Sequence, residues 1–232
     1  MPTSFARPQI NSDERMLWIH AGPHKAASSY VTERVRKNRA ALATQRVLMD
    51  GDNNFLANSI AEKNYQPLEH ALSGLSSDFQ RILISSSSLD TRILKRSVLT
   101  ILRDMASSYG FKLGVSYFIR DQQSWLNSVY CHRVRRFRST PDFPNYCRYI
   151  MNNPGSWDIS CPSKFRALME YPEIVKMFLP LSREVDITDP FLALTSALGL
   201  REPDDHGWLK GEPSKKNIQP GAKGIWMSRI CY

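Results

Sequence analysis

The chain has 232 residues, of which 42% are hydrophobic, so it is long and apolar enough to fold around a core and is not compositionally disordered. Its net charge of +9 favours an anionic partner: a nucleotide, a sulfated or phosphorylated substrate, nucleic acid or a membrane surface. The four cysteines form no C-x-x-C pair, which argues against a disulfide framework or a zinc site and is typical of a cytoplasmic protein.

The N-terminal segment, residues 1–14, is predicted to be a flexible tail, because it is polar and lacks the apolar stretch of a secretory signal. No apolar run in the sequence approaches the length of about 18 residues that a membrane-spanning helix needs. We therefore expect a cytoplasmic protein without a transmembrane segment, in which residues 15–232 form a single domain.

Predicted strands and helices alternate along this domain. Apolar runs predict strands at 16–20, 81–85 and 113–119, and apolar residues at helical spacing predict helices at 26–43, 90–110 and 122–138. Asp90 is the predicted N-cap of the second helix, and Gly110 is its predicted C-terminal stop. The alternation predicts an α/β fold with three layers, in which helices cover both faces of a central parallel sheet.

The stretch GPHKAASSY, which begins at Gly22, lies where the first strand gives way to the first helix. Ligands of parallel sheets bind outside the carboxyl ends of the strands, where a helix N-terminus offers backbone N–H groups to an anion. Gly22 permits close approach of the backbone, Lys25 adds a positive charge, and Ser28 and Ser29 add hydroxyl donors. The spacing is not that of a Walker A motif, so the alternative is an ordinary strand-to-helix turn with a surface lysine.

A second candidate anion site follows the third predicted strand. Arg120 lies where that strand ends, and Ser128 lies about two helical turns further along. An arginine and a helix serine that converge on one pocket suit a second phosphate group. The alternative is a surface ion pair between Arg120 and the adjacent Asp121.

Together, the two motifs resemble those of the PAPS-dependent sulfotransferases, where PAPS is 3′-phosphoadenosine 5′-phosphosulfate. The family's strand and G-P-x-K-[ST]-[GA]-[ST]-[ST] loop read IHAGPHKAASSY here, and its strand, R-D-P and serine read YFIRDQQSWLNSVY. The chain is most similar to a bacterial branch that acts on polysaccharides or glycolipids. This similarity extends from about Met16 through the later runs EVDITDPFLALTSALGL and NIQPGAKGIWMSR.

The resemblance implies a P-loop NTPase-like sulfotransferase fold and a reaction that needs no metal. A sulfuryl group would pass from PAPS to a hydroxyl or amine of an anionic or neutral glycan or glycolipid, leaving PAP (adenosine 3′,5′-bisphosphate) as the product. Lys25 would be catalytic, because it would stabilise the charge on the leaving 5′-phosphate. The residues that the resemblance implies for cofactor binding are Gly22, Pro23, His24, Lys25, Ala26, Ala27, Ser28 and Ser29 at the 5′-phosphosulfate, with Arg120 and Ser128 at the 3′-phosphate.

Two departures from the family pattern bear on activity. Ala26 and Ala27 stand where the family has Thr-Gly or Ser-Gly, so one hydroxyl is lost and Ala27 crowds a backbone that usually carries glycine. Ser87 occupies the catalytic position of a Ser-Ser-Glu run, whose glutamate is the expected base for the acceptor hydroxyl. A serine without a partner is not a general base near neutral pH, so a weakly active or inactive protein is expected unless another group serves. The candidates for that group are Asp90, His24 and His132.

Two other functions stay open on the sequence alone. The first is a nucleotide-dependent phosphotransferase of the P-loop kinase type, which is weakened by the missing Walker A glycine and by the lack of a clear Mg²⁺-binding carboxylate after a strand. The second is a basic nucleic-acid-binding protein without catalysis, which the net positive charge allows. Nucleic acid is not the favoured partner, because the sequence has no recognised DNA- or RNA-binding motif. The basic run HRVRRFR at 132–138 is interpreted either as a solvated helix face or as a patch that attracts an anionic acceptor such as an acidic glycan.

Overall fold

A computed structural model describes residues 14–22, 26–50, 54–76, 78–135, 141–153, 161–181, 189–204 and 207–210 of the chain. The chain divides into two compact units. The first comprises Met1–Ile119 and Ala167–Gly211, and the second comprises Arg120–Arg166 and Glu212–Tyr232. The expected single domain at 15–232 stays a prediction, and the two units are described separately below.

The first unit is built on a five-stranded sheet. Its strands, in the spatial order β2-β3-β1-β4-β5, are β2 (Val47–Met49), β3 (Arg81–Ser85), β1 (Met16–His20), β4 (Lys112–Arg120) and β5 (Val175–Leu181). β1 lies between β3 and β4 and runs parallel to both, and β2 runs parallel to β3. The three strands predicted from apolar runs are therefore confirmed, and their carboxyl ends share one edge of the sheet.

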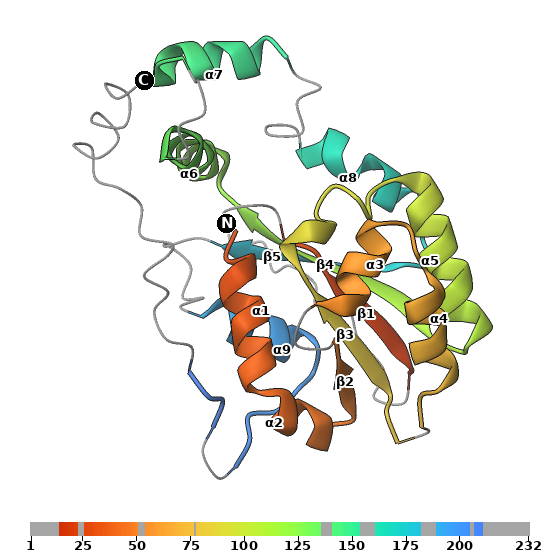
Figure 1. Ribbon diagram of the computed structural model, residues 1–232. Helices are drawn as coiled ribbons and strands as arrows, with labels where there is room; N and C mark the ends of the chain where they lie inside the picture. Colours follow the sequence, from red (N-terminus) through yellow and green to blue (C-terminus); the bar gives the residue numbers. More distant parts are fainter. Residues whose placement is uncertain are drawn as a thin grey trace. The chain divides into compact units, whose positions relative to one another are not determined.

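Helices cover both faces of this sheet, as Figure 1 shows. One face carries α1 (Ser28–Lys37), α2 (Arg39–Thr44) and α9 (Pro190–Ala197), and the other carries α3 (Phe55–Ala61), α4 (Gln66–Ser73) and α5 (Arg96–Ser108). Successive residues of a strand point to opposite faces, so each central strand supplies apolar side chains to both layers. The predicted three-layer α/β/α fold with a central parallel sheet is confirmed.

The core under α1 explains why a glycine stands within the central strand β4. Trp18, Leu83 and Phe118, from three neighbouring strands, are buried in one cluster with Val31 and other apolar residues of α1, α2 and α9. The indole of Trp18 lies directly over Gly114, its register partner on β4. A Cβ on Gly114 would lie 2.4 Å from the indole ring, so only glycine fits at this point of the central strand.

The helix predicted at 26–43 is instead two helices, α1 and α2, which meet at Asn38. The side-chain amide of Asn38 donates to the carbonyl oxygens of Arg34 at 2.7 Å and of Leu209 at 3.0 Å, and its oxygen accepts the Leu209 N–H at 2.7 Å. These bonds tie the break to a segment near the far end of the sequence. The apolar spacing continues through the break, so the sequence pattern does not reveal it.

The prediction that Asp90 caps the helix after β3 is wrong. The short helix η1 (Ser87–Leu89) follows β3, and α5 begins only at Arg96, with Lys95 at its N-cap position. Asp90 is buried, and its backbone carbonyl accepts the Tyr117 hydroxyl at 2.6 Å. The predicted C-terminal stop is confirmed, because α5 ends at Ser108 and Gly110 follows with a positive φ of 74°.

The second unit contains α6 (Gln122–Arg135), α7 (Phe143–Met151) and most of α8 (Cys161–Met169). Its small core is formed by buried side chains of α6 and α7, with Leu126 and Phe143 packed against them: Tyr130, Cys131, Val134, Tyr146 and Ile150. The helix predicted at 122–138 is confirmed as far as Arg135, and 136–138 lie outside the described residues. Among the helices that the structure describes, none has the length and apolar content to cross a bilayer.

Candidate functional site

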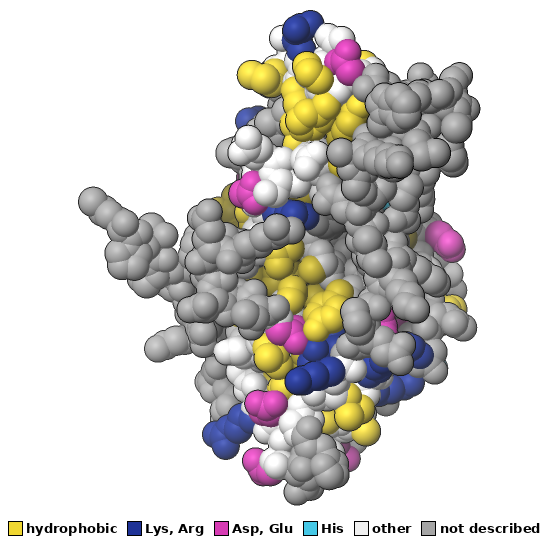
Figure 2. Space-filling view, turned by 90° about the vertical axis from the view of Figure 1, so that its left-hand side faces the viewer, with side chains coloured by type: hydrophobic (Ala, Val, Ile, Leu, Met, Phe, Trp, Pro, Cys, Tyr) yellow, Lys and Arg dark blue, Asp and Glu magenta, His cyan; other side chains and the backbone are white. Residues whose placement is uncertain are grey.

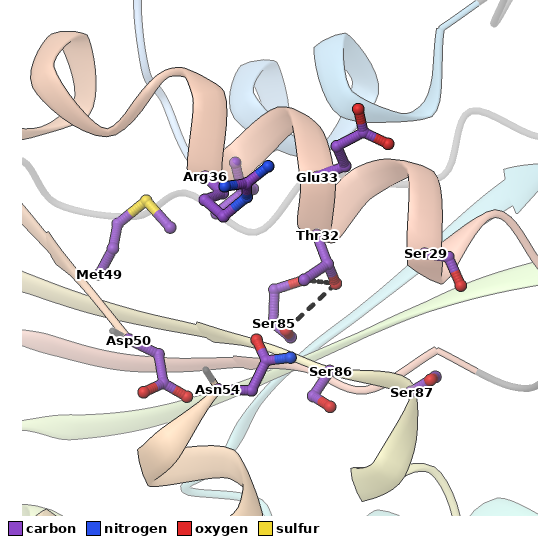
Figure 3. A pocket seen from close by; sticks show the side chains of 11 residues that line it. Ser29, Thr32, Glu33, Arg36, Met49, Asp50, Asn54, Ser85, Ser86 and Ser87 are labelled. Carbon is purple, nitrogen blue, oxygen red and sulfur yellow. Dashed lines mark hydrogen bonds between the residues drawn. The ribbon is translucent and has the colours of Figure 1, made fainter. Parts of the chain in front are cut away.

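A cavity of about 300 Å³ lies beside α1, where β2 and β3 end (Figure 3). This is the edge of a parallel sheet at which ligands of such folds bind. Most of the lining is polar, and it comes from α1, from the segment after β2 and from the segment after β3. The lining residues are Ser29, Thr32, Glu33, Val35, Arg36, Met49, Asp50, Asn54, Ser85, Ser86 and Ser87.

Two of the predicted site residues, Ser29 and Ser87, line this one cavity. Ser29 lies in the first turn of α1 and is exposed, and Ser87 begins η1 directly after β3. The Ser86 side chain positions this turn by accepting the Ser88 N–H at 3.2 Å. The structure thus joins a residue predicted to bind the cofactor to one predicted on the acceptor side. Pro23, His24 and Lys25 lie outside the described residues.

The start of α1 also accounts for the small residues around the loop. A Cβ on Gly22 would lie 2.4 Å from the Ser28 Cβ, so glycine is required here for packing of the chain against the helix. Ser28 and Ala26 are buried. Ala27 has φ 59° and ψ 5°, a left-handed conformation that costs an L-residue about 1–2 kcal/mol. Ala27 therefore adopts a backbone conformation that favours glycine, and the cofactor-binding roles of these residues stay predictions.

Arg120 and Ser128 belong to the second unit, at the end of β4 and within α6. Both are partly buried. The neighbouring Asp121 caps α6, because its carboxylate accepts the Ser124 N–H at 2.7 Å. That hydrogen bond, more than the nearby Arg120 charge, holds the pKa of Asp121 below its usual range. The predicted role of Arg120 and Ser128 at a 3′-phosphate remains a prediction.

A buried polar network lies beneath the cavity. His20 ends β1 and is fully buried, and its Nδ1 is 2.8 Å from the Ser85 Oγ. The Thr32 hydroxyl lies 3.0 Å from the same Oγ and donates to the Ser85 carbonyl at 3.1 Å, as the dashed lines in Figure 3 show. Burial lowers the pKa of His20 to about 4, so the imidazole is neutral near pH 7. The network fastens α1 to β1 and β3.

A buried carboxylate, Asp50, is one of several cavity residues that were not predicted from the sequence. It follows β2, and its Oδ1 and Oδ2 accept the N–H groups of Leu56 and Ala57, each at 2.9 Å. These bonds attach the strand end to the first turn of α3. The signal in the sequence was an aspartate after an apolar run, Val47–Met49, but a run of three residues was too short to be recognised as a strand.

The other candidate bases named from the sequence are not among the residues that line the cavity. Asp90 is absent from the lining, His132 lies in the second unit, and His24 lies outside the described residues. Within the described part of the chain, no group of three or more His, Cys, Asp or Glu residues could hold a metal ion.

The surface that Figure 2 shows carries charged side chains of both signs. In Figure 2, Lys and Arg side chains in the lower half of the view lie close to Asp and Glu side chains. α1 and α2 carry exposed basic residues, among them Arg36 and Arg39, and Arg36 also lines the cavity. Arg36 therefore supplies positive charge at the cavity, which suits an anionic ligand.

No protein-family model matches the chain, and a search of curated proteins finds no match. Among solved structures, the chain is similar to a fungal RNA kinase, with 12% identity and a TM-score of 0.39 over 94% of this chain and 99% of that one. It is also similar to a structure from the PezAT toxin–antitoxin system of Streptococcus pneumoniae, with 12% identity and a TM-score of 0.41 over 97% of this chain and 90% of that one. Similarities this weak decide nothing about function. The class that the fold itself defines is a three-layer α/β protein with a central parallel sheet.

Proposed function

We propose that this protein is a PAPS-dependent sulfotransferase that transfers a sulfuryl group to a hydroxyl or amine of a carbohydrate or glycolipid. PAPS is the donor, PAP is the product, and no metal takes part. Lys25 and the N-terminal turn of α1 hold the 5′-phosphosulfate, and Arg120 and Ser128 hold the 3′-phosphate. The acceptor occupies the cavity beside α1.

One observation carries this proposal. Ser29, assigned to the cofactor, and Ser87, assigned to the acceptor side, line the same cavity at the carboxyl edge of the sheet. Sulfuryl transfer needs the donor sulfur and the acceptor oxygen in one pocket, in line with the leaving oxygen. The hydroxyl, amide and charged groups of the lining suit a hydroxylated acceptor better than an apolar one.

The competing hypothesis of a nucleotide-dependent phosphotransferase differs in its donor. A phosphotransferase requires ATP with Mg²⁺. In sulfuryl transfer, the negative charge that develops on the leaving oxygens can be stabilised by preorganised N–H groups and a lysine. The two functions are therefore separated by the donor that the protein uses, whatever the acceptor.

The test is transfer of ³⁵S from labelled PAPS to a panel of polysaccharides and glycolipid extracts, run in parallel with ³²P transfer from ATP and Mg²⁺. We expect ³⁵S transfer that is lost in Lys25→Ala and kept in Lys37→Ala, a matched change on α1 whose lysine pairs with Glu33 at 3.5 Å. Incorporation of ³²P with no ³⁵S incorporation would replace the proposal by the phosphotransferase.

A further inference from the structure

One side of α1 forms a wall of the cavity. The residues of α1 that line it with polar or charged side chains are Ser29, Thr32, Glu33 and Arg36, at the spacing of one helix face. A helix rises about 1.5 Å per residue, so Arg36 lies about 10 Å along α1 from Ser29. Ser29 is at the end of the helix that is assigned to the cofactor. Arg36 therefore lies beside the part of the cavity that is left for the acceptor.

Arg36 carries a charge that the protein does not offset. Within the described part of the chain, its guanidinium forms no ion pair and no hydrogen bond. The two carboxylates of the lining are already engaged, because Glu33 pairs with Lys37 at 3.5 Å and Asp50 accepts two backbone N–H groups of α3. A guanidinium with unused donors is suited to hold a carboxylate or sulfate group through two parallel hydrogen bonds.

Asn54 is a second cavity residue whose side chain the fold does not use. It occupies the N-cap position of α3, where an asparagine normally accepts the N–H of the second or third helical residue. Those two N–H groups, of Leu56 and Ala57, are instead taken by Asp50, each at 2.9 Å. The Asn54 amide makes no cap hydrogen bond, and no other group in the described ranges bonds to it. The amide can therefore both donate to and accept from a ligand in the cavity.

The backbone at Asn54 holds this amide at the cavity. Its φ of 52° lies in the left-handed region, which asparagine adopts more readily than most residues. Figure 3 shows the amide directed toward α1, with Arg36 on that helix across the cavity. Two side chains with unused hydrogen-bonding groups thus lie on opposite sides of one cavity.

We propose that this cavity binds an acidic sugar of the acceptor, whose carboxylate or sulfate group is held by Arg36 and whose hydroxyl groups are held by Asn54. This proposal rests on the proposed function and narrows its acceptor from glycans in general to acidic glycans. Sugar hydroxyls donate and accept hydrogen bonds, as the Asn54 amide does. Ligand pockets typically enclose about 300–1,000 Å³, so a cavity of about 300 Å³ suits a short stretch of a glycan.

The test is calorimetric titration with acidic oligosaccharides and with a neutral form of each. The probes are oligosaccharides that contain galacturonic or glucuronic acid, compared with their carboxyl-reduced forms, and sulfated galactose oligosaccharides, compared with their desulfated forms. Each pair differs in the anionic group alone. We expect an acidic probe to bind at least about tenfold more tightly than its neutral form, because hydrogen bonds to charged groups are the stronger ones. The pair that shows this preference identifies the group as carboxylate or sulfate.

Arg36→Gln is expected to abolish the preference, so that the acidic and neutral forms bind equally. Arg39→Gln is the matched control, because it removes the same charge from an exposed position of α2 that does not line the cavity. The preference should survive in this control.

Asn54→Gly is expected to weaken the acidic and neutral forms alike, by about threefold to tenfold, because one or two neutral hydrogen bonds are lost. Glycine accepts the left-handed backbone, so this change removes the amide without adding strain. Lys63→Gly is the control, because Lys63 is exposed, has a positive φ of 63° and does not line the cavity. Circular dichroism and thermal melts verify that each variant is folded.

No binding of any probe, equal binding of every acidic probe and its neutral form, or a preference that survives Arg36→Gln would overturn the proposal of an acidic acceptor. Unchanged binding by Asn54→Gly would overturn the role of Asn54. The titrations are run with and without PAP, because the sugar site does not need PAP to be tested. Failure of the unmodified protein to bind PAP would refute the proposed function, and it is thereby distinguished from failure to bind the sugars.

Discussion

Replacing Ala27 by glycine should stabilise the protein, against the usual effect of that substitution. Ala27 precedes α1 with φ 59°, where an L-residue bears a penalty of about 1–2 kcal/mol. Glycine relieves this penalty but loses about 0.5–1 kcal/mol through the greater freedom of the unfolded chain. The net gain is the difference of these two ranges, about 0–1.5 kcal/mol, which for a chain of this size raises the melting temperature by up to about 6 °C.

Urea unfolding at constant pH measures this change directly, and Ala43→Gly is its control. Ala43 is an exposed residue inside α2, where the same substitution should cost about 0.5–1 kcal/mol. Gly110→Ala is the reverse substitution at a second position with a positive φ. Gly110 has φ 74° and no atom within 4 Å of an added Cβ, so backbone strain alone should lower the free energy of unfolding by about 1 kcal/mol. Destabilisation of Ala27→Gly to the same extent as Ala43→Gly would refute the left-handed geometry at Ala27.

Three further predictions follow from buried charges and from the second phosphate site. Asp189→Ala should cost about 3–5 kcal/mol in urea unfolding, because it leaves the buried Arg34 guanidinium without the carboxylate that it contacts at 2.6 Å; a loss under 1 kcal/mol would contradict this. In the folded protein the pKa of His20 is lowered from 6.5 to about 4, so between these pH values the unfolded chain binds a proton that the folded protein does not. The free energy of unfolding should therefore fall by up to about 3 kcal/mol as the pH falls from 6.5 to about 4. Thermal melts at several pH values should show a smaller decline in stability for His20→Gln, whereas His70→Gln, at an exposed position, is the control that should keep the decline. Equal declines in both variants would show that His20 is not its source. Arg120→Ala should weaken binding of PAP more than binding of AMP in calorimetric titrations, and equal losses would assign Arg120 a structural role.

The central layers of the fold were predictable because they depend on local apolar runs. β1, β3 and β4 are strands of five to nine residues in which most of the buried side chains are apolar. β2 was missed because three residues carry too little pattern. The break between α1 and α2 was missed because it depends on hydrogen bonds between Asn38 and Leu209, which lie 171 residues apart in the sequence.

The candidate site was predictable only in part. Ser29 and Ser87 could be singled out from the sequence because each lies just after a recognisable strand, and both line the cavity, while their roles stay predictions. Asp50 was not predicted, since its place at the cavity follows from the pairing of β2 with β3 and from the backbone of α3. The assignment of Asp90 as a helix cap failed because η1 separates β3 from α5.

Titration of the unmodified protein with PAP, and separately with ATP and Mg²⁺, tests whether its nucleotide is the product of PAPS or ATP. A ligand that binds only the folded state stabilises it by about 2.7 kcal/mol at a hundredfold excess over its Kd, and this is readily detected in a thermal melt. We expect PAP to bind without a metal and to raise the melting temperature more than ATP and Mg²⁺ do at equal concentration. A clear shift with ATP and Mg²⁺ and none with PAP would contradict it.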